Sequence, residues 1–366
     1  MNKKSFLRLT TLLTPLQKKK GIGIALLTFL GSLLDFTSVA TFLPLLYVII
    51  RPESLEGHEY VKSVYHWGGF ESYTVFLTSI ISVVGLLLII KNYVAWRITK
   101  VKVEYAFSLG SDLSSSTMQR YSQMNYALFP DVDFTKELNR ITNYPFAFSN
   151  NIVLPLLNLS SEIFVCTLIV TGLSFYNIQV VIIILVILVP AVVAFRIRKK
   201  SLESISNALK SKYPALLKNT LRMIEGFAEI RAFRKQVFFH SRFEAINKEV
   251  AKTMIKDHVA QNGTARLTEV MVSTAICVLI LYPIVTGQTQ EQTLLLIGVF
   301  ATAGFRIIPS VNRIFHALQQ MRVHEHVIEE LQTLTADIKT PIGEMHPSRM
   351  VFKEAIVLKN ISFAYP

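Results

Sequence analysis

Long apolar runs alternate with long polar stretches along this chain. Each apolar run is close to, or longer than, the ~20 residues that a helix needs to cross a bilayer. The runs lie at about 21–50, 73–96, 152–175, 178–195, 267–285 and 293–323. The polar stretches 97–150 and 196–266 contain few helix breakers, so we expect helices there that continue beyond the membrane. The pattern predicts an all-α membrane protein with six transmembrane helices and long cytoplasmic extensions.

The last apolar run carries charge where contact with lipid would be costly. At the helical period of about 100° per residue, one stripe of it is polar or small. That stripe comprises Arg306, Ser310, Arg313, Ala317 and Gln320, and the opposite side comprises Ile307, Ile308, Val311, Ile314 and Phe315. Arginine is tolerated within a bilayer where it faces a bundle interior or a water-filled cavity. We therefore expect this helix to line the pathway of a transporter.

Composition and charge agree with a membrane location. The chain is 51% hydrophobic and its charged fraction is 17%, below the roughly 25% of soluble domains. If alternate loops lie on opposite sides of a membrane, nearly all of the 38 Lys and Arg residues fall on one side. This positive-inside bias places both termini in the cytoplasm, in a multi-pass protein of the inner (cytoplasmic) membrane. The net charge of +13 does not indicate nucleic acid, because no basic patch is interleaved with aromatic residues.

The ends of the chain have their own patterns. Residues 1–20 mix leucines with lysines and arginines, which predicts an amphipathic elbow helix lying in the membrane interface. Residues 326–348 are polar and read as a linker, and 349–366 read as short strands. The two cysteines, Cys166 and Cys277, lie within apolar runs and form neither a metal-ligand spacing nor a disulfide framework.

This layout, closing on VLKNISFAYP, resembles the membrane half of an ATP-binding-cassette (ABC) exporter of the six-helix half-transporter type. The resemblance implies a type I exporter transmembrane domain over 21–325. It also implies that 349–366 are the first strands of an α/β nucleotide-binding domain, in which Tyr365 would stack on adenine. The chain contains no G-x-x-x-x-G-K-[ST] loop. ATP and Mg²⁺ would therefore be bound by a part of the protein that follows.

Two cytoplasmic segments are expected to couple the membrane part to that ATPase domain. The stretch LRMIEGFAEIRAFRKQVFFHSRF is similar to the family's second cytoplasmic loop. The resemblance places one coupling segment near 231–239, with Arg231, Phe233, Arg234 and Phe238. The other would lie near 130–138, with Pro130, Asp133 and Phe134. The alternative is a solvated hairpin with a charged face, against which its many phenylalanines argue.

The expected substrate cavity is cationic. Lys91, Arg266, Arg306 and Arg313 form a ladder of positive charge from mid-membrane to the inner surface. Arginine binds phosphate through two parallel hydrogen bonds, so an anionic lipid headgroup is a natural cargo. The structural alternative is that Asp35, Glu162 or Glu269 neutralises these cations, or that Lys91 and Arg266 extend to the interface.

The segment GFRIIPSVNRIFHALQQ is similar to the sixth helix of bacterial flippases for lipid-linked oligosaccharides. We therefore expect the transmembrane half of an ATP-driven exporter or flippase that pairs with a second, identical half-transporter. Its cargo would be an amphipathic, anionic lipid or a lipid-linked oligosaccharide. An ABC exporter of peptides or drugs is the alternative within the family, although its cavity should be more aromatic. A channel or secondary transporter is the alternative from another class.

Overall fold

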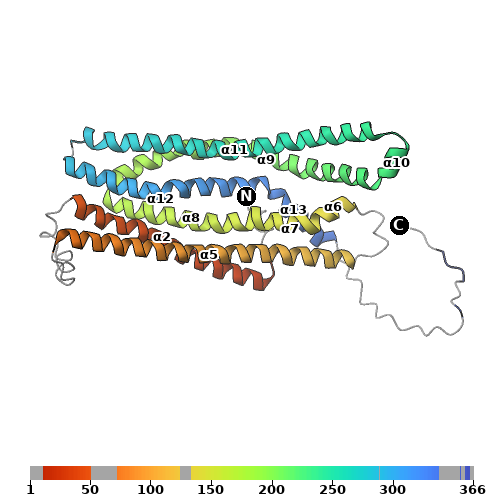
Figure 1. Ribbon diagram of the computed structural model, residues 1–366, viewed down its shortest axis with the longest axis horizontal. Coiled ribbons are helices and arrows are strands. Elements are labelled where there is room, and N and C mark those ends of the chain that lie inside the picture. Colours follow the sequence, from red (N-terminus) through yellow and green to blue (C-terminus); the bar gives the residue numbers. More distant parts are fainter. Residues whose placement is uncertain are drawn as a thin grey trace.

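The computed structural model describes residues 11–50, 72–123, 133–287 and 289–337, together with positions 355 and 359–362. All elements within these residues are helical, and the long helices run side by side in an elongated bundle (Figure 1). The long helices are α2 (Pro15–Ile50), α5 (Tyr73–Ser122), α8 (Leu154–Tyr176), α9 (Ile178–Glu225), α11 (Gln236–Val285), α12 (Gln290–Val323) and α13 (Glu325–Asp337). Shorter pieces are α6 (Phe134–Leu138), α7 (Tyr144–Phe148), α10 (Phe227–Ala232) and the π-helical turns η2 (Asn139–Asn143) and η3 (Ser149–Val153).

Four helical stretches among the described residues are long and apolar enough to cross a membrane. They are Thr74–Ser122, Phe134–Phe175, Gln236–Val285 and Gln292–Val323. The predicted spans 21–50 and 178–195 lie within α2 and α9. Helices α5 and α11 contain 50 residues each, which is about 75 Å of helix against a hydrocarbon layer of ~30 Å. The expectation of an all-helical protein with helices long and apolar enough for a membrane is confirmed for the described residues, whereas the count of six spans stays a prediction.

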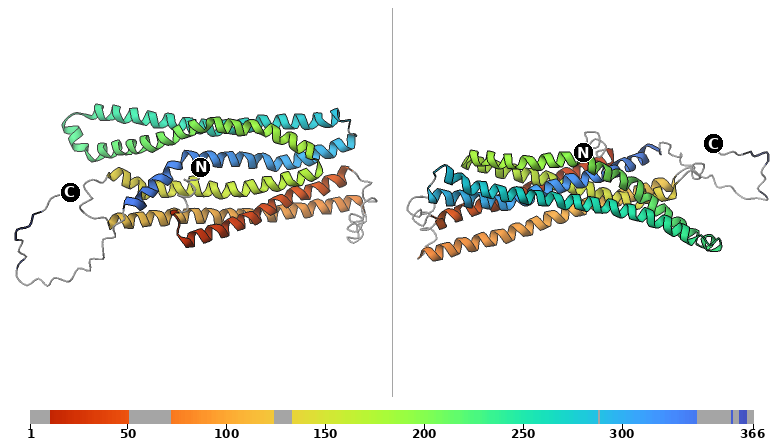
Figure 2. Two further views of the ribbon diagram at one scale, coloured as in Figure 1. Left: turned by 180° about the vertical axis from the view of Figure 1, so that it is seen from behind. Right: turned by 90° about the horizontal axis from the view of Figure 1, so that it is seen from above.

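Helix α12 is the centre of the bundle. It packs against α8, α11, α2 and α9, while α5 packs on α2 and on α7 (Figures 1 and 2). One apolar core joins α8 to α12 through residues that include Val165, Ile169, Val299, Phe300 and Ala303. A second core lies where α5, α7, η3, α12 and α13 meet, and it includes Leu109, Phe148, Ile152, Met321 and Ile328. The predicted pathway helix is therefore held on several sides.

Local signals set the beginnings of two of these helices. Thr289 caps α12 in a reciprocal capping box, in which its Oγ1 accepts from the Gln292 backbone N–H at 3.4 Å and Gln292 Oε1 accepts from the Thr289 N–H at 3.3 Å. Thr14 and Gln17 form the same exchange ahead of α2, with Pro15 as its first residue. Helix α2 thus begins six residues before the predicted start of the first span, and the stretch 15–20 continues directly into it.

The hairpin of α9 and α11 is closed by α10 at its far end (Figures 1 and 2). Here the short helix lies at Phe227–Ala232, and α11 begins at Gln236. The predicted coupling segment 231–239 therefore covers the end of α10, the turn and the start of α11. Arg234 in this turn has a φ of 55°, and the backbone N–H of Lys235 donates to the Ile230 carbonyl at 2.9 Å. These features end α10 in a left-handed C-cap, a position that usually carries glycine.

Several expectations fall outside the described residues. Among them are residues 1–10 of the elbow helix, Pro130 of the first coupling segment and Tyr365. The side chain of Asp35 is outside them too. The described positions within 349–366 are not in strands. The start of a nucleotide-binding domain therefore stays a prediction.

Candidate functional site

A polar cleft of about 550 Å³ opens where η3 and the start of α8 meet α11 and α12. Eight of the eleven lining residues have polar side chains, and six of these are carboxamides. The lining residues are Asn150, Leu154, Pro155, Asn158, Gln261, Asn262, Asn312, Arg313, His316, Ala317 and Gln320. Such side chains both donate and accept hydrogen bonds, so the cleft can bind phosphate, hydroxyl or amide groups.

The helical period of α12 brings its polar face to the cleft. Arg313, Ala317 and Gln320 of the predicted polar stripe line it, whereas Ser310 is fully buried and donates to the Arg306 carbonyl at 3.0 Å. On the opposite side, Ile307, Ile308 and Val311 line a small apolar cleft between α11 and α12. The polar face of α12 therefore lines one cleft, and its apolar face lines the other.

One amide of the cleft is bonded within the protein, and another is open to a ligand. Gln320 Nε2 donates to Asn151 Oδ1 at 2.8 Å and so fixes η3 against α12. Asn312 Oδ1 is buried and accepts no hydrogen bond from any described residue. A buried amide oxygen without a donor is costly, so a ligand hydroxyl or a water molecule would be well placed there.

Glu162 on α8 joins the two arginines of α12. Its Oε1 accepts from Arg313 Nε at 2.6 Å and its Oε2 accepts from Arg313 Nη2 at 3.3 Å. Arg306 Nη2 lies 3.8 Å from the same Oε2. The structural alternative foreseen for these cations, neutralisation by Glu162, is therefore present in the structure.

The four predicted cavity residues are not brought together. Arg313 lines the cleft and Arg306 is linked to it through Glu162, but Lys91 lies on α5 and does not line the cleft. Arg266 on α11 points to the surface and pairs with Glu269 at 2.9 Å. The i,i+3 ion pair is thus present between Arg266 and Glu269. The structure thus gathers two of the four cations, since Arg266 is exposed on α11 and Lys91 is not among the residues that line the cleft.

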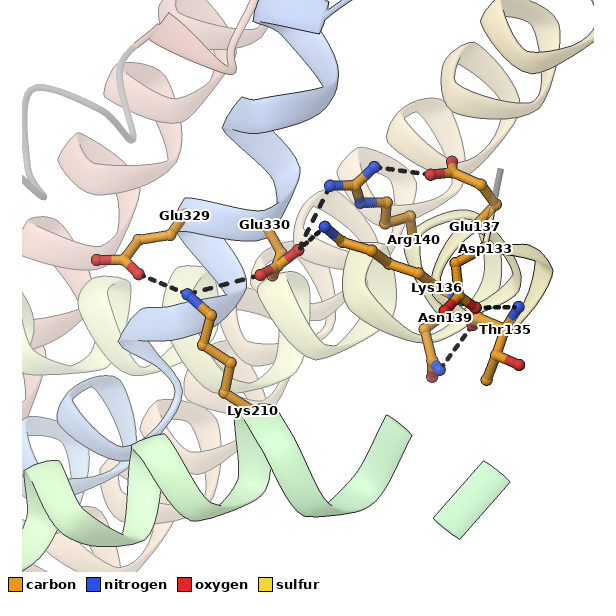
Figure 3. A network of polar contacts seen from close by, with 9 residues as sticks. All are labelled: Asp133, Thr135, Lys136, Glu137, Asn139, Arg140, Lys210, Glu329 and Glu330. Atoms are coloured by element: carbon orange, nitrogen blue, oxygen red, sulfur yellow. Dashed lines mark hydrogen bonds and ion pairs between the residues drawn. The ribbon is translucent and has the colours of Figure 1, made fainter. Parts of the chain in front are cut away.

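A second polar centre ties α13 to two stretches that join apolar runs, the first loop (97–150) and the second loop (196–266) (Figure 3). Glu330 on α13 lies 3.9 Å from Lys136 Nζ and 3.5 Å from Arg140 Nη2, in the first loop. Its other oxygen lies 3.5 Å from Nζ of Lys210 on α9, and Lys210 also pairs with Glu329 at 3.1 Å. Helix α13 therefore binds the two loops at one point.

His326 lies beside this network. Its Nδ1 is 3.1 Å from Ser206 Oγ on α9, and burial lowers the pKa of the ring to about 4. Arg322, at the end of α12, forms ion pairs with Glu203 and Glu325. Together these contacts fix the junction of α12 and α13 to α9.

The described residues of the two predicted coupling segments lie at the loop ends. Asp133 caps α6 and pairs with Lys218 of α9 at 2.5 Å, and the Lys218 hydrogen bond lowers the pKa of the Asp133 carboxyl. Phe134 is exposed. At the other tip, Phe233 is 74% exposed. Aromatic and basic side chains prevail on the concave surface of this tip, which is lined by Arg222, Phe233, Lys235, Phe238, Phe239 and Arg242 together with Gly226, Ile230 and one acidic residue, Glu229. Arg231 and Arg234 are exposed nearby.

The comparisons name no relative. No protein-family model matches the chain, and no curated protein matches it at a significant level. Within the described residues there is no group of three or more His, Cys, Asp or Glu side chains that could hold a metal ion.

Of the six amide side chains of the cleft, Gln320 lies on the predicted polar stripe, and the sequence reasoning missed the other five. A signal was present, because Asn150, Leu154 and Asn158 follow a spacing of four, as do Asn312, His316 and Gln320. That spacing places each set on one helix face. Glu330, which pairs with Lys136, Arg140 and Lys210, gave no such signal. Charged residues are common in a polar segment such as the one that forms α13.

Proposed function

We propose that the chain is the transmembrane half of an ATP-driven exporter or flippase for amphipathic, anionic lipids, including lipid-linked oligosaccharides. The observation that carries this proposal is the α9–α10–α11 hairpin. It presents an aromatic and basic surface at the end of helices far longer than a bilayer requires. Such a tip suits docking onto a cytoplasmic domain that drives the membrane helices. Channels and secondary transporters have no need of it.

The cargo site in this proposal is the polar cleft with Arg313. The guanidinium suits a phosphate or pyrophosphate group, and the amides suit hydroxyl-rich groups linked to it. Arg313 and six carboxamide side chains line the cleft and no Phe, Tyr or Trp does, which favours a lipid headgroup over an aromatic drug. Two copies of the chain would enclose the pathway, since six spans form half of a transporter of this class.

The test uses the complete gene product reconstituted in proteoliposomes. ATP hydrolysis and ATP-dependent movement of a pyrophosphate-linked lipid are measured for the wild type, Arg313→Ala and Arg266→Ala. We expect Arg313→Ala to lose movement of the lipid while it keeps basal ATP hydrolysis, because its guanidinium lines the cleft. Arg266→Ala is the matched control, since Arg266 also pairs with a glutamate three residues later but points to the surface. Lipid movement that is independent of ATP would refute the proposal. Equal losses of lipid movement in both variants would indicate that Arg266 also belongs to the cargo site, as the sequence predicted.

A further inference from the structure

Glu162 competes for the same atoms that an anionic cargo would use. Its two oxygens face Nε and Nη2 of Arg313 at 2.6 and 3.3 Å, which is the two-point geometry of a carboxylate on a guanidinium. The glutamate side chain is only 11% exposed, whereas that of Arg313 is 46% exposed and lines the cleft. A phosphate that enters from the cleft therefore meets an arginine whose side-on edge already holds an anion.

Arg306 also contacts the Glu162 carboxylate. Its Nη2 lies 3.8 Å from Oε2, with its side chain 18% exposed. Glu162 is therefore shared between two guanidinium groups. Because Glu162 and Arg306 are largely shielded from solvent, their charges interact more strongly than exposed charges would. The Arg313 side chain is open to the cleft, so an entering phosphate and Glu162 compete for its guanidinium group.

We propose that Glu162 is a built-in counter-ion, which a phosphate-bearing headgroup displaces from Arg313 and which later returns to expel it. This inference rests on the proposed function and adds a specificity-determining residue to its cargo site. Glu162 would weaken binding, so that the cleft is not blocked by an anion that it holds too tightly. A purely structural role for the ion pair makes a different prediction, namely that removal of the carboxylate lowers stability without raising affinity for anions.

Binding is measured on the purified protein in detergent by titration calorimetry. The probes are inorganic pyrophosphate and farnesyl pyrophosphate, and the variants are Glu162→Gln, Glu162→Asp and the control Glu269→Gln. Glutamine keeps the shape but not the charge, so we expect Glu162→Gln to bind pyrophosphate about tenfold more tightly. Glu162→Asp should keep most of the competition. Glu269→Gln should resemble the wild type, since Glu269 neutralises an arginine outside the cleft. Unchanged or weaker binding in folded Glu162→Gln would overturn the proposal.

A double variant keeps the test decisive if Glu162→Gln does not fold. The variant Glu162→Gln/Arg306→Gln has the same net charge in the cluster as the wild type but lacks the competing carboxylate. It should bind pyrophosphate more tightly than Arg306→Gln alone, and equal affinities would refute the displacement.

The two probes distinguish the source of the phosphate. Similar affinities for both indicate recognition of the free anion, and a clear preference for farnesyl pyrophosphate indicates a lipid headgroup. The same variants separate this inference from the proposed function. Tighter binding by Glu162→Gln without ATP-driven lipid movement would support the counter-ion and refute the exporter. ATP-driven lipid movement in the wild type, with unchanged pyrophosphate binding by Glu162→Gln, would support the exporter and refute the counter-ion.

Discussion

Lowering the pH from 7 to 5 should destabilise the protein through His326. This residue is 8% exposed and lies between α13 and α9, with its Nδ1 3.1 Å from Ser206 Oγ. Burial lowers the pKa of its ring to about 4, and the neighbouring His324 adds to this shift. A histidine in the unfolded chain has a pKa of about 6.5. Between these two values the unfolded chain binds more protons than the folded protein, so stability falls as the pH falls.

The size of the effect follows from the two pKa values. At pH 7 the ring is neutral in the folded protein and about three-quarters neutral in the unfolded chain. At pH 5 the unfolded histidine is nearly all protonated while the folded one is still mostly neutral, which amounts to a loss of about 2 kcal/mol of unfolding free energy. The loss is complete once the pH is below about 4. The Val323 carbonyl, 3.2 Å from Nδ1, opposes part of the pKa shift because it can only accept a hydrogen bond, whereas burial lowers the pKa by more.

The assay is chemical unfolding of the purified protein in detergent, followed by circular dichroism at pH 7 and pH 5. Carboxyl groups contribute to the pH dependence of every variant, so the informative quantity is the difference between wild type and His326→Gln. We expect His326→Gln to lose about 2 kcal/mol less than the wild type over this interval. His240→Gln is the control, because His240 is exposed. An equal loss in wild type and His326→Gln would show that the ring does not titrate as argued.

Two further predictions concern glycine and left-handed positions. A Cβ at Gly110 would lie 2.5 Å from Ser149 Oγ, so Gly110→Ala should cost about 1–3 kcal/mol in thermal or chemical unfolding. Gly85→Ala on the same helix meets open space and should be neutral or stabilising; equal effects would refute the packing argument. Arg234 has a φ of 55°, so Arg234→Gly should stabilise the protein by about 0.5–1 kcal/mol, whereas Arg231→Gly within α10 should destabilise it. A loss in Arg234→Gly would mean that its side-chain contacts outweigh the strain.

Positions of helices followed directly from the sequence, because backbone groups in a bilayer must bond within their own helix and apolar side chains must cover it. This is why the apolar runs coincide with helices and why the breaker-poor stretches continue them. Boundaries were less predictable. The first helix starts at Pro15 instead of Gly21, since the Thr14 cap and Pro15 outweigh the change from basic to apolar residues.

The amphipathic pattern of 293–323 determined by itself that one face of this helix is polar and the other apolar, because side-chain direction repeats every 3.6 residues. Tertiary structure alone decided what each face meets. The packing of α8 against α12 placed Glu162 at the arginines, and the rotation of α11 turned Arg266 to the surface. It also brought Glu330 to Arg140 of the first loop and Lys210 of the second. Such pairings join residues more than a hundred positions apart, and the pattern within one helix carries no information about the azimuth of its neighbours.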